Sequence, residues 1–232
     1  MTASIAVIGG TGPQGKGLGY RFARAGHTVV LGSRAAERAE ATAAEVRGRL
    51  SAVEGAGPVT GASNVDACER ADLVVLAIPY DGHDELVASL ALAGKIVISC
   101  VNPLAFDKRG AHGVAIDGGE GSASESAQRL QPDATVVGAF HHVSAVNLWG
   151  EAEFLDGEDV LVIGDDAGAK AQIIDLASAV TGRPGIDAGK LRLARQLEPL
   201  TAVLISINRR YKIHSGLRVH GMPGGEPETA RP

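Results

Sequence analysis

The chain has few aromatic residues and no excess of positive charge. Phe, Trp and Tyr make up 3% of its 232 residues, so it offers little aromatic surface on which nucleobases could stack. The formal net charge is −5, and no obvious basic run provides the footprint that binding to a phosphate backbone requires. We therefore expect no nucleic-acid partner.

Cysteine is also scarce, and long apolar runs are missing. Cys68 and Cys100 are far apart and are not spaced as a metal knuckle, so we expect free thiols in a reducing compartment. No apolar run approaches the length of a membrane span, and the amino terminus lacks the pattern of a signal peptide. We expect a cytoplasmic protein with no membrane partner.

The first half of the chain alternates apolar runs with helical patterns. Strands are predicted at 4–10, 27–33, 58–63, 71–79 and 95–101, and helices between them at about 15–25, 35–50, 64–70 and 82–92. Continuous Val and Ile runs are typical of strands that are buried on both faces. The pattern predicts an α/β fold with a doubly wound parallel sheet.

The second half is less regular. Strands are predicted at 134–143 and 159–166 and a helix near 168–180, and the longest helical pattern runs from about 191 to 213, where Pro199 predicts a kink or a break. We expect two domains, 1–140 and 141–220, followed by a flexible tail at 221–232. One apolar stripe of the long helix either caps the core or forms a dimer face: Leu193, Leu197, Leu200, Leu204 and Ile207.

A glycine-rich turn follows the first predicted strand. The segment 10–15 reads Gly-Thr-Gly-Pro-Gln-Gly, which fits the dinucleotide-binding pattern G-x-G-x-x-G at a strand-to-helix junction. Gly10 is expected to permit the tight turn, Gly12 to let the backbone approach a pyrophosphate, and Gly15 to let the helix pack on the strand. The alternative is a turn that serves packing alone. The predicted cofactor contacts here are Gly10, Thr11, Gly12, Pro13, Gln14 and Gly15.

The turn after the second predicted strand lacks an acidic residue. NAD-dependent enzymes usually place Asp or Glu there to bind the ribose, but this chain has Ser33 and Arg34, with Arg38 four residues further on. Guanidinium groups bind a 2′-phosphate that a carboxylate would repel, and the spacing predicts that both arginines lie on one helix face. The sequence thus favours NADP(H), although arginine is also common at a solvated helix start.

These turns, together with "LAIPY" at 76–80, "GAFHHVSA" at 138–145 and "DAGKLRLARQLEPLTAVL" at 187–204, give the chain a resemblance to a known family. It resembles the NADPH-dependent reductases of the 5-deazaflavin coenzyme F420, from residue 4 to about 220. The resemblance implies a Rossmann-type domain with a small C-terminal α/β portion, a homodimer, and reversible hydride transfer between NADPH and F420. The segments 99–106 and beyond Arg210 match the family less well.

The resemblance also assigns residues to the site. Ile78 and Pro79 would flank the nicotinamide, and His141 would lie beside the deazaflavin and position its ring. The substrate contacts that we expect are Val101, Asn102, His141, Val143 and Ala145. Lys108, Arg109 and Arg195 are candidates for binding the polar tail of the deazaflavin.

The residues by themselves leave other interpretations open. His141 is equally well explained as a structural residue, and because His141 and His142 would point to opposite faces of a strand, we expect no metal site. Cys100 is more simply a small buried apolar side chain than a redox group. The function has two alternatives: an NADPH-dependent reductase of another acceptor, such as a flavin, ferric chelate or imine, and a non-catalytic NADP(H) sensor.

Overall fold

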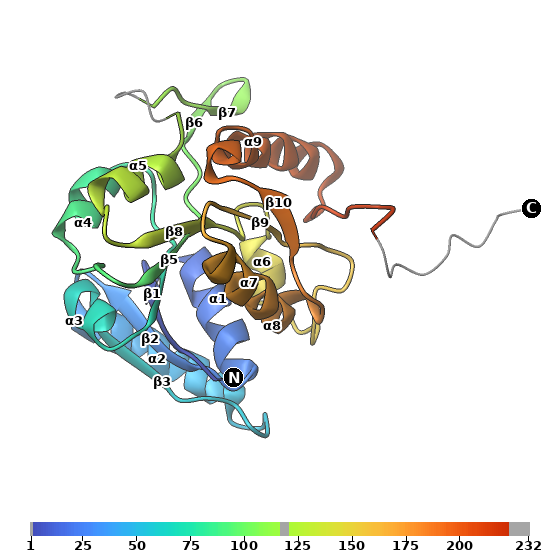
Figure 1. The fold of residues 1–232 in the computed structure, drawn as a ribbon. Helices are drawn as coiled ribbons and strands as arrows, with labels where there is room; N and C mark the ends of the chain where they lie inside the picture. Colours follow the sequence, from blue (N-terminus) through green and yellow to red (C-terminus); the bar gives the residue numbers. More distant parts are fainter. Residues whose placement is uncertain (1, 117–120, 223–232) are drawn as a thin grey trace, which may run out of the picture.

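A computed structural model describes residues 2–116 and 121–222. The described chain is built on one large sheet with helices on both sides (Figure 1). Its strands lie in the order β10-β9-β8-β5-β4-β1-β2-β3. Their bounds are β1 (Ser4–Ile8), β2 (Thr28–Ser33), β3 (Val59–Ser63), β4 (Leu73–Leu76), β5 (Ile96–Ser99), β8 (Thr135–Gly138), β9 (Leu161–Gly164) and β10 (Ile186–Gly189).

The strand order creates a crevice at the carboxyl end of β1. This strand pairs in parallel with β2 on one side and with β4 on the other, and the chain winds outward in both directions from there. Only β8 and β9 pair in an antiparallel sense among the described neighbours of this sheet. The predicted doubly wound α/β fold is therefore confirmed, and its topology places ligand binding between β1 and β4.

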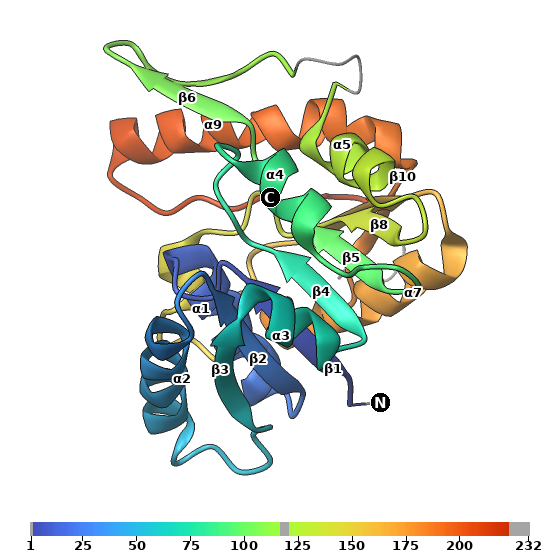
Figure 2. The ribbon, with the colours of Figure 1, turned by 90° about the vertical axis from the view of Figure 1, so that its left-hand side faces the viewer.

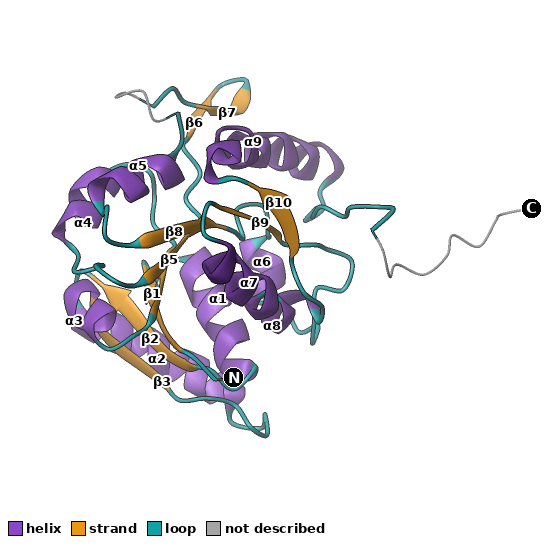
Figure 3. Cartoon of the chain, viewed as in Figure 1, coloured by secondary structure: helices purple, strands orange, loops and turns teal. Residues whose placement is uncertain are grey.

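Helices cover both faces of the sheet, as Figure 3 shows. On β1, Ile5 and Val7 belong to the apolar cluster that includes α1 and α2, whereas Ala6 and Ile8 belong to the cluster that includes α3, α4 and α5. No helix among the described residues has both the length and the apolar character that a membrane crossing requires. The helices are α1 (Pro13–Arg24), α2 (Ala36–Leu50), α3 (Asn64–Glu69), α4 (His83–Ser89), α5 (Ala123–Leu130), α6 (Ala145–Leu148), α7 (Ala167–Leu176), α8 (Ser178–Thr181) and α9 (Ala194–Tyr211), with a short 3-10 helix at Leu191–Leu193.

The second half of the chain joins the same sheet through β9 and β10. A hairpin of β6 (Leu104–Asp107) and β7 (Gly110–Gly113) lies along α9 (Figure 2). Helix α9 runs through Pro199 without interruption, so the alternative of two separate helices is wrong. The division into domains at residue 140 stays a prediction, and the predicted tail lies outside the described residues from 223 onward.

A buried carboxylate fastens α9 to α5. Glu198 is 1% exposed, and its two oxygens accept hydrogen bonds from the backbone N–H groups of Ala123 at 2.8 Å and Ser124 at 2.9 Å. These donors stand in the first turn of α5, where backbone N–H groups have no acceptor within the helix. The contact therefore holds α9 across the carboxyl end of the sheet.

Candidate functional site

The turn between β1 and α1 has less room than its sequence pattern suggests. Gly9 and Gly10 both lie in the turn, and Gly9, which is outside the pattern, is the one with a left-handed φ of +80°. Gly10 is required for another reason, because a Cβ there would lie 2.9 Å from the Cβ of Leu31. A Cβ on Gly15 would overlap the Gly9 carbonyl oxygen, as expected for close contact between helix and strand.

The amino terminus of α1 is free to bind an anion. Gly12 occupies the N-cap position and provides no side-chain cap, Pro13 begins the helix, and the first turn contains no acidic residue. The first N–H groups of a helix lack acceptors within it, and the helix dipole favours negative charge at this end. A Cβ on Gly12 would meet only the Gly9 carbonyl oxygen, at 3.3 Å, so Gly12 is open on its outer side.

The carboxyl end of β2 presents two unpaired guanidinium groups. Arg34 and Arg38 are exposed, and neither side chain forms an ion pair or hydrogen bond with a described residue. Ser33 is buried, and its hydroxyl accepts a 3.4 Å hydrogen bond from the N–H of Ala35. Because α2 begins at Ala36, Arg34 precedes the helix, and the expectation that both arginines share one helix face is wrong. Both still lie at the turn where β2 ends.

A cleft of about 490 Å³ opens at the crevice between β1 and β4. It brings together predicted residues from distant parts of the chain: Gly12, Pro13, Gln14, Ile78, Pro79, Asn102, His141, Val143 and Ala145. Val101 is not among them, since it is 1% exposed and packs in the core, so we withdraw it as a substrate contact. Gly10, Thr11, Gly15, Ser33, Arg34 and Arg38 stand outside this cleft, beside β1 and β2.

His141 lies in a turn and not, as predicted, in a strand, because β8 ends at Gly138. Its backbone carbonyl accepts hydrogen bonds from Asn102 Nδ2 at 2.8 Å and from Thr201 Oγ1 at 3.0 Å. Both ring nitrogens are buried without a partner among the described residues, and burial lowers the pKa of His141 to about 3. The ring is therefore neutral near pH 7 and does not supply a proton there.

The turn that carries His141 is held in an uncommon conformation. Phe140 has a φ of 61°, which is rare for a residue with a side chain. Gln14 Nε2 donates a 3.2 Å hydrogen bond to the Phe140 carbonyl, and the Phe140 ring packs edge-on against Phe22 at 5.7 Å. Gln14, predicted to contact the cofactor, thus also fixes the opposite wall of the cleft.

Two other reactive side chains of the cleft, those of His142 and Cys100, form hydrogen bonds within the protein. His142 Nε2 donates a 2.7 Å hydrogen bond to the carbonyl oxygen of Asp159, and burial lowers the pKa of its ring. Burial raises the pKa of the Cys100 thiol to about 12, and its Sγ donates to the Leu76 carbonyl at 3.0 Å. Among the described residues, no group of three or more His, Cys, Asp or Glu side chains is arranged to hold a metal ion.

Sequence reasoning missed one wall of the cleft. The stripe on α9 was interpreted as a core cap or a dimer face, but the helix also presents Thr201, Leu204, Ile205 and Asn208 to the cleft, and Ser215 follows it. Spacings of three, four and seven residues place these side chains on one helix face. Polar residues at 201 and 208 on an otherwise apolar face were a signal that could have identified this wall.

Two arginines that we expected to bind the polar tail of the deazaflavin, Arg195 and Arg109, lie close to carboxylates within the protein. Arg195 forms two 2.8 Å hydrogen bonds to the carboxylate of Glu125, one from Nε and one from Nη2. Arg109 lies at the tip of the hairpin, 3.7 Å from the carboxylate of Asp107. Neither residue lines the cleft, so the geometry does not favour them for this role.

We expect His141 to make the protein less stable in acid. Its folded-state pKa of about 3 lies below the ordinary 6.5, so below pH 6.5 the unfolded chain binds a proton that the folded chain refuses. The stability associated with the neutral ring is complete above pH 6.5 and is lost as the pH falls toward 3, at up to about 1.4 kcal/mol per pH unit. Urea unfolding between pH 4 and 6.5 should therefore show a smaller slope for His141→Gln than for the parent chain.

The variant must be compared with the parent because Glu198, another buried group, changes the stability with pH in the opposite direction. Burial raises the pKa of Glu198 from 4.5 to about 7, so within that range its contribution to stability decreases as the pH rises. Both proteins share this contribution, and it cancels in the difference. Equal slopes for His141→Gln and the parent would show that His141 is protonated in the folded state.

Comparison with known proteins connects this cleft to a family. The family model described as "NADP oxidoreductase coenzyme F420-dependent" matches residues 4–103. The F420-dependent NADP reductase of Methanothermobacter thermautotrophicus is 37% identical over 97% of this chain and 98% of its own length. The F420-dependent NADP reductase of Methanocaldococcus jannaschii is 35% identical over 93% of this chain and 97% of its own length.

A solved structure supports the same relationship. It comes from Arthrobacter sp. FB24, is assigned as an F420-dependent NADP reductase, and superposes with a TM-score of 0.74 at 28% identity. The match covers 91% of this chain and 96% of the other. With curated relatives above 30% identity over nearly the full length, the chain belongs to the family of F420-dependent NADP reductases.

Proposed function

We propose that this protein transfers a hydride reversibly between NADPH and coenzyme F420. The observation that carries the proposal is a cleft of about 490 Å³ in which the end of the glycine turn, Ile78 and Pro79 face the His141 turn and α9. One cleft with a dinucleotide-binding wall and a second, unrelated wall suits two ligands that must touch. The family relationship supplies the identity of both.

The first wall fits NADPH. The open outer side of Gly12 and the free N–H groups of α1 suit a pyrophosphate, which accepts hydrogen bonds from backbone donors. Arg34 and Arg38 have charges that no described carboxylate neutralises, which suits a 2′-phosphate. We propose that Ile78 and Pro79, which follow β4, contact the nicotinamide side.

The second wall fits a flat ring with polar edges. Its apolar residues include Val143, Leu204 and Ile205, and it contains buried polar atoms that have no partner among the described residues, namely Asn102 Oδ1 and the ring nitrogens of His141. Buried polar atoms without a partner are costly, so a bound ligand that hydrogen-bonds to them is stabilised. We propose that Asn102, His141, Val143 and Ala145 contact the deazaflavin.

The chemistry requires orientation more than acid or base catalysis. Bound together, NADPH supplies the hydride that the deazaflavin ring accepts. The apolar side chains of the cleft would exclude water and bring the two rings together, which would make the transfer effectively unimolecular. The neutral His141 ring would orient the deazaflavin beside it. Hydrogen bonds from Asn102 and Thr201 to the backbone carbonyl of His141 fix the position of His141.

The direct test is turnover with purified protein. NADPH and oxidised F420 are mixed, and the visible absorbance of the deazaflavin is followed, with NADH and riboflavin in parallel reactions. We expect absorbance to fall with NADPH and F420 and to stay constant with NADH. Reduction of riboflavin but not of F420 would refute the choice of acceptor and leave the NADPH assignment intact.

The 2′-phosphate assignment has its own test. Arg34→Ala should raise KM for NADPH about 10-fold and change KM for NADH less than about twofold, because only NADPH has the phosphate. Arg70→Ala, an exposed arginine at the end of α3, is the control and should change neither. Equal effects of Arg34→Ala on both nucleotides would remove the assignment.

The proposal extends to the assembly and its location. We propose a homodimer, as the family resemblance implies, and exposed apolar side chains support it: Phe106 is 71% exposed and Val203 is 53% exposed. Static light scattering at several concentrations tests this. We also propose that 141–220 acts as a second domain that completes the cleft, and that the protein is cytoplasmic, where the buried thiols of Cys68 and Cys100 remain reduced.

A further inference from the structure

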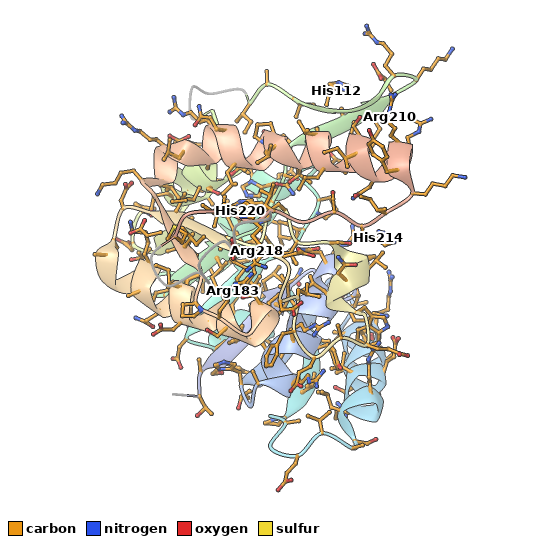
Figure 4. All side chains as sticks on the ribbon, turned by 90° about the vertical axis from the view of Figure 1, so that its right-hand side faces the viewer. His112, Arg183, Arg210, His214, Arg218 and His220 are labelled. Carbon is orange, nitrogen blue, oxygen red and sulfur yellow. The ribbon has the colours of Figure 1, made fainter. Side chains whose placement is uncertain are left out.

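The net charge of −5 conceals a local concentration of basic residues. From the end of α9 onward, the segment 209–220 contains six basic residues and no Asp or Glu, and we refer to it as the basic strip. Its basic residues are Arg209, Arg210, Lys212, His214, Arg218 and His220. In Figure 4, Arg210, His214, Arg218 and His220 lie along one face of the molecule, from the end of α9 across the segment that follows it.

The basic strip has no regular structure beyond Tyr211, yet hydrogen bonds hold its backbone in place. Asn208 Oδ1 accepts from the N–H of Ser215 at 2.6 Å, and the carbonyl of His214 accepts from Asn147 Nδ2 at 3.2 Å. Asp159 makes two further contacts: its N–H donates to Leu217 at 2.7 Å, and its carboxylate accepts from the N–H of Val219 at 2.7 Å. The basic side chains therefore project from a fixed backbone.

The charges of the strip are not neutralised within the described chain. The side chains of Arg209, Arg210, Lys212, His214 and His220 form no ion pair or hydrogen bond with any residue that the structure describes. Arg218 makes a single 3.4 Å hydrogen bond to a backbone carbonyl, that of Asp156.

The carboxylates beside the strip do not balance it. Asp159 pairs at 3.0 Å with Arg183, which lies outside the strip. Burial raises the pKa of Glu158, whose side chain lies against Gly216 of the strip, and so disfavours its charged form. A third acidic residue, Asp156, contacts Arg218 through its backbone carbonyl. Within the part of the chain that the structure describes, the positive charge of the strip thus exceeds the negative charge paired with it.

The strip begins where the cleft ends. Asn208 and Ser215, which flank its first half, both line the cleft. The hydroxyl of Ser215 is buried and has no partner among the described residues, so the end of the cleft beside the strip contains an unused hydrogen-bonding group. Ser215 thus belongs both to the lining of the cleft and to the strip, and His214 and Arg218 lie one and three residues from it in the sequence.

We propose that the basic strip binds the anionic tail of the deazaflavin, its phosphodiester and glutamate carboxylates. This inference rests on the proposed function, because it takes the ring of the same molecule to lie in the cleft. Guanidinium and ammonium groups form charge-assisted hydrogen bonds with phosphate and carboxylate oxygens. The strip thereby confers preference for the complete coenzyme over the bare deazaflavin, whereas the cleft recognises the ring common to both.

The test compares two ligands and two variants. Kd is measured by fluorescence titration, and KM and kcat by absorbance, for F420 and for the same deazaflavin lacking the phosphodiester and glutamates. Arg210→Glu/Arg218→Glu reverses two charges of the strip. Arg70→Glu/Arg192→Glu reverses two exposed charges elsewhere and serves as the matched control.

We expect the strip variant to raise Kd and KM for F420 about 10-fold, because exposed charge pairs contribute modestly and two are reversed. Kd for the tail-less deazaflavin, KM for NADPH and kcat should change less than about twofold, as should every value for the control variant. Added salt should weaken F420 binding to the parent protein and leave the tail-less ligand unaffected, since salt screens exposed charges.

The other possible results either overturn the inference or separate it from the proposed reaction. Equal losses for both deazaflavins, or equal parent Kd values with no salt dependence, overturn the inference. Dissociation of the variant into monomers with loss of kcat for both ligands assigns the strip to a subunit contact and also overturns it. Tail-dependent binding without turnover supports the strip but refutes the proposed reaction, and absence of F420 binding refutes both.

Discussion

Gly15→Ala should disable the protein at the cofactor turn. A Cβ at this position would overlap the Gly9 carbonyl oxygen and lie 2.9 Å from the Cα of Gly10, and neither is a flexible side-chain end that can move aside. The turn must therefore shift away from α1. We expect a loss of about 2 kcal/mol in stability, typical of overpacking, and a rise of about 30-fold or more in KM for NADPH as the pyrophosphate donors are displaced.

Two glycines provide controls for this experiment. Gly48 lies exposed within α2 with nothing within 4 Å of a Cβ, so Gly48→Ala should leave KM unchanged and stabilise the protein by about 0.5–1 kcal/mol. Gly12→Ala should fold normally, since its Cβ meets one atom at 3.3 Å, and should still weaken NADPH binding. Normal NADPH kinetics in Gly15→Ala would mean that the turn tolerates displacement and does not hold the pyrophosphate.

The fold was predictable because burial on both faces leaves a strong pattern. Ile5 and Val7 face one helical layer while Ala6 and Ile8 face the other, so the whole strand is apolar and cannot be mistaken for a half-exposed one. The glycine turn then fixed the direction of the sheet and the position of its crevice. Composition, periodicity and one motif sufficed for this part.

Features that depend on contacts between distant residues were not predictable. The β6–β7 hairpin lies in a turn-rich segment without alternation, and it forms where it can pack on α9, about 90 residues later. Strand β8 ends at Gly138, and the turn that follows has Phe140 at a φ of 61° with its carbonyl bound by Gln14, which comes from α1, more than 100 residues earlier. Gly9 appeared to be an ordinary strand residue because its need for glycine arises from the backbone of Ala77, just after β4.

The same limit applied to the site. A helix with an apolar stripe predicts that one face is buried, but not whether that face covers a core or a ligand. Thr201 became informative only when its hydroxyl was found to donate to the carbonyl of His141, 60 residues away in the sequence. We expected no basic run from the sequence, although residues 209–220 contain six basic side chains and no Asp or Glu. Asn208 and Ser215, which line the cleft, give that segment its significance.

Arg21 was not identified from the sequence, and its side chain joins α1 to the end of α6 and the segment that follows it. It is fully buried within α1 and donates to four backbone carbonyls: Leu148 at 2.7 Å, Ala152 at 2.7 Å, Glu153 at 2.7 Å and Asn147 at 2.9 Å. Burial lowers the pKa of its guanidinium, but the positive charge is favourable beside the carbonyls that end α6. Ala145, at the other end of that short helix, lines the cleft.

Arg21→Met should therefore lower the free energy of unfolding by at least about 3 kcal/mol, because it leaves several buried carbonyls without donors. A melting temperature lower by about 10 °C corresponds to this in a chain of this size. Arg24→Met, one turn along α1 and only 3.6 Å from Glu153, is the control and should cost less than about 1 kcal/mol. Arg21→Lys should fall between them, since an ammonium restores the charge but cannot reach four acceptors at once. Urea unfolding decides the matter: equal stabilities of Arg21→Met and Arg24→Met would mean that water satisfies the carbonyls, and that packing of α1 against Leu148 alone holds α6 in place.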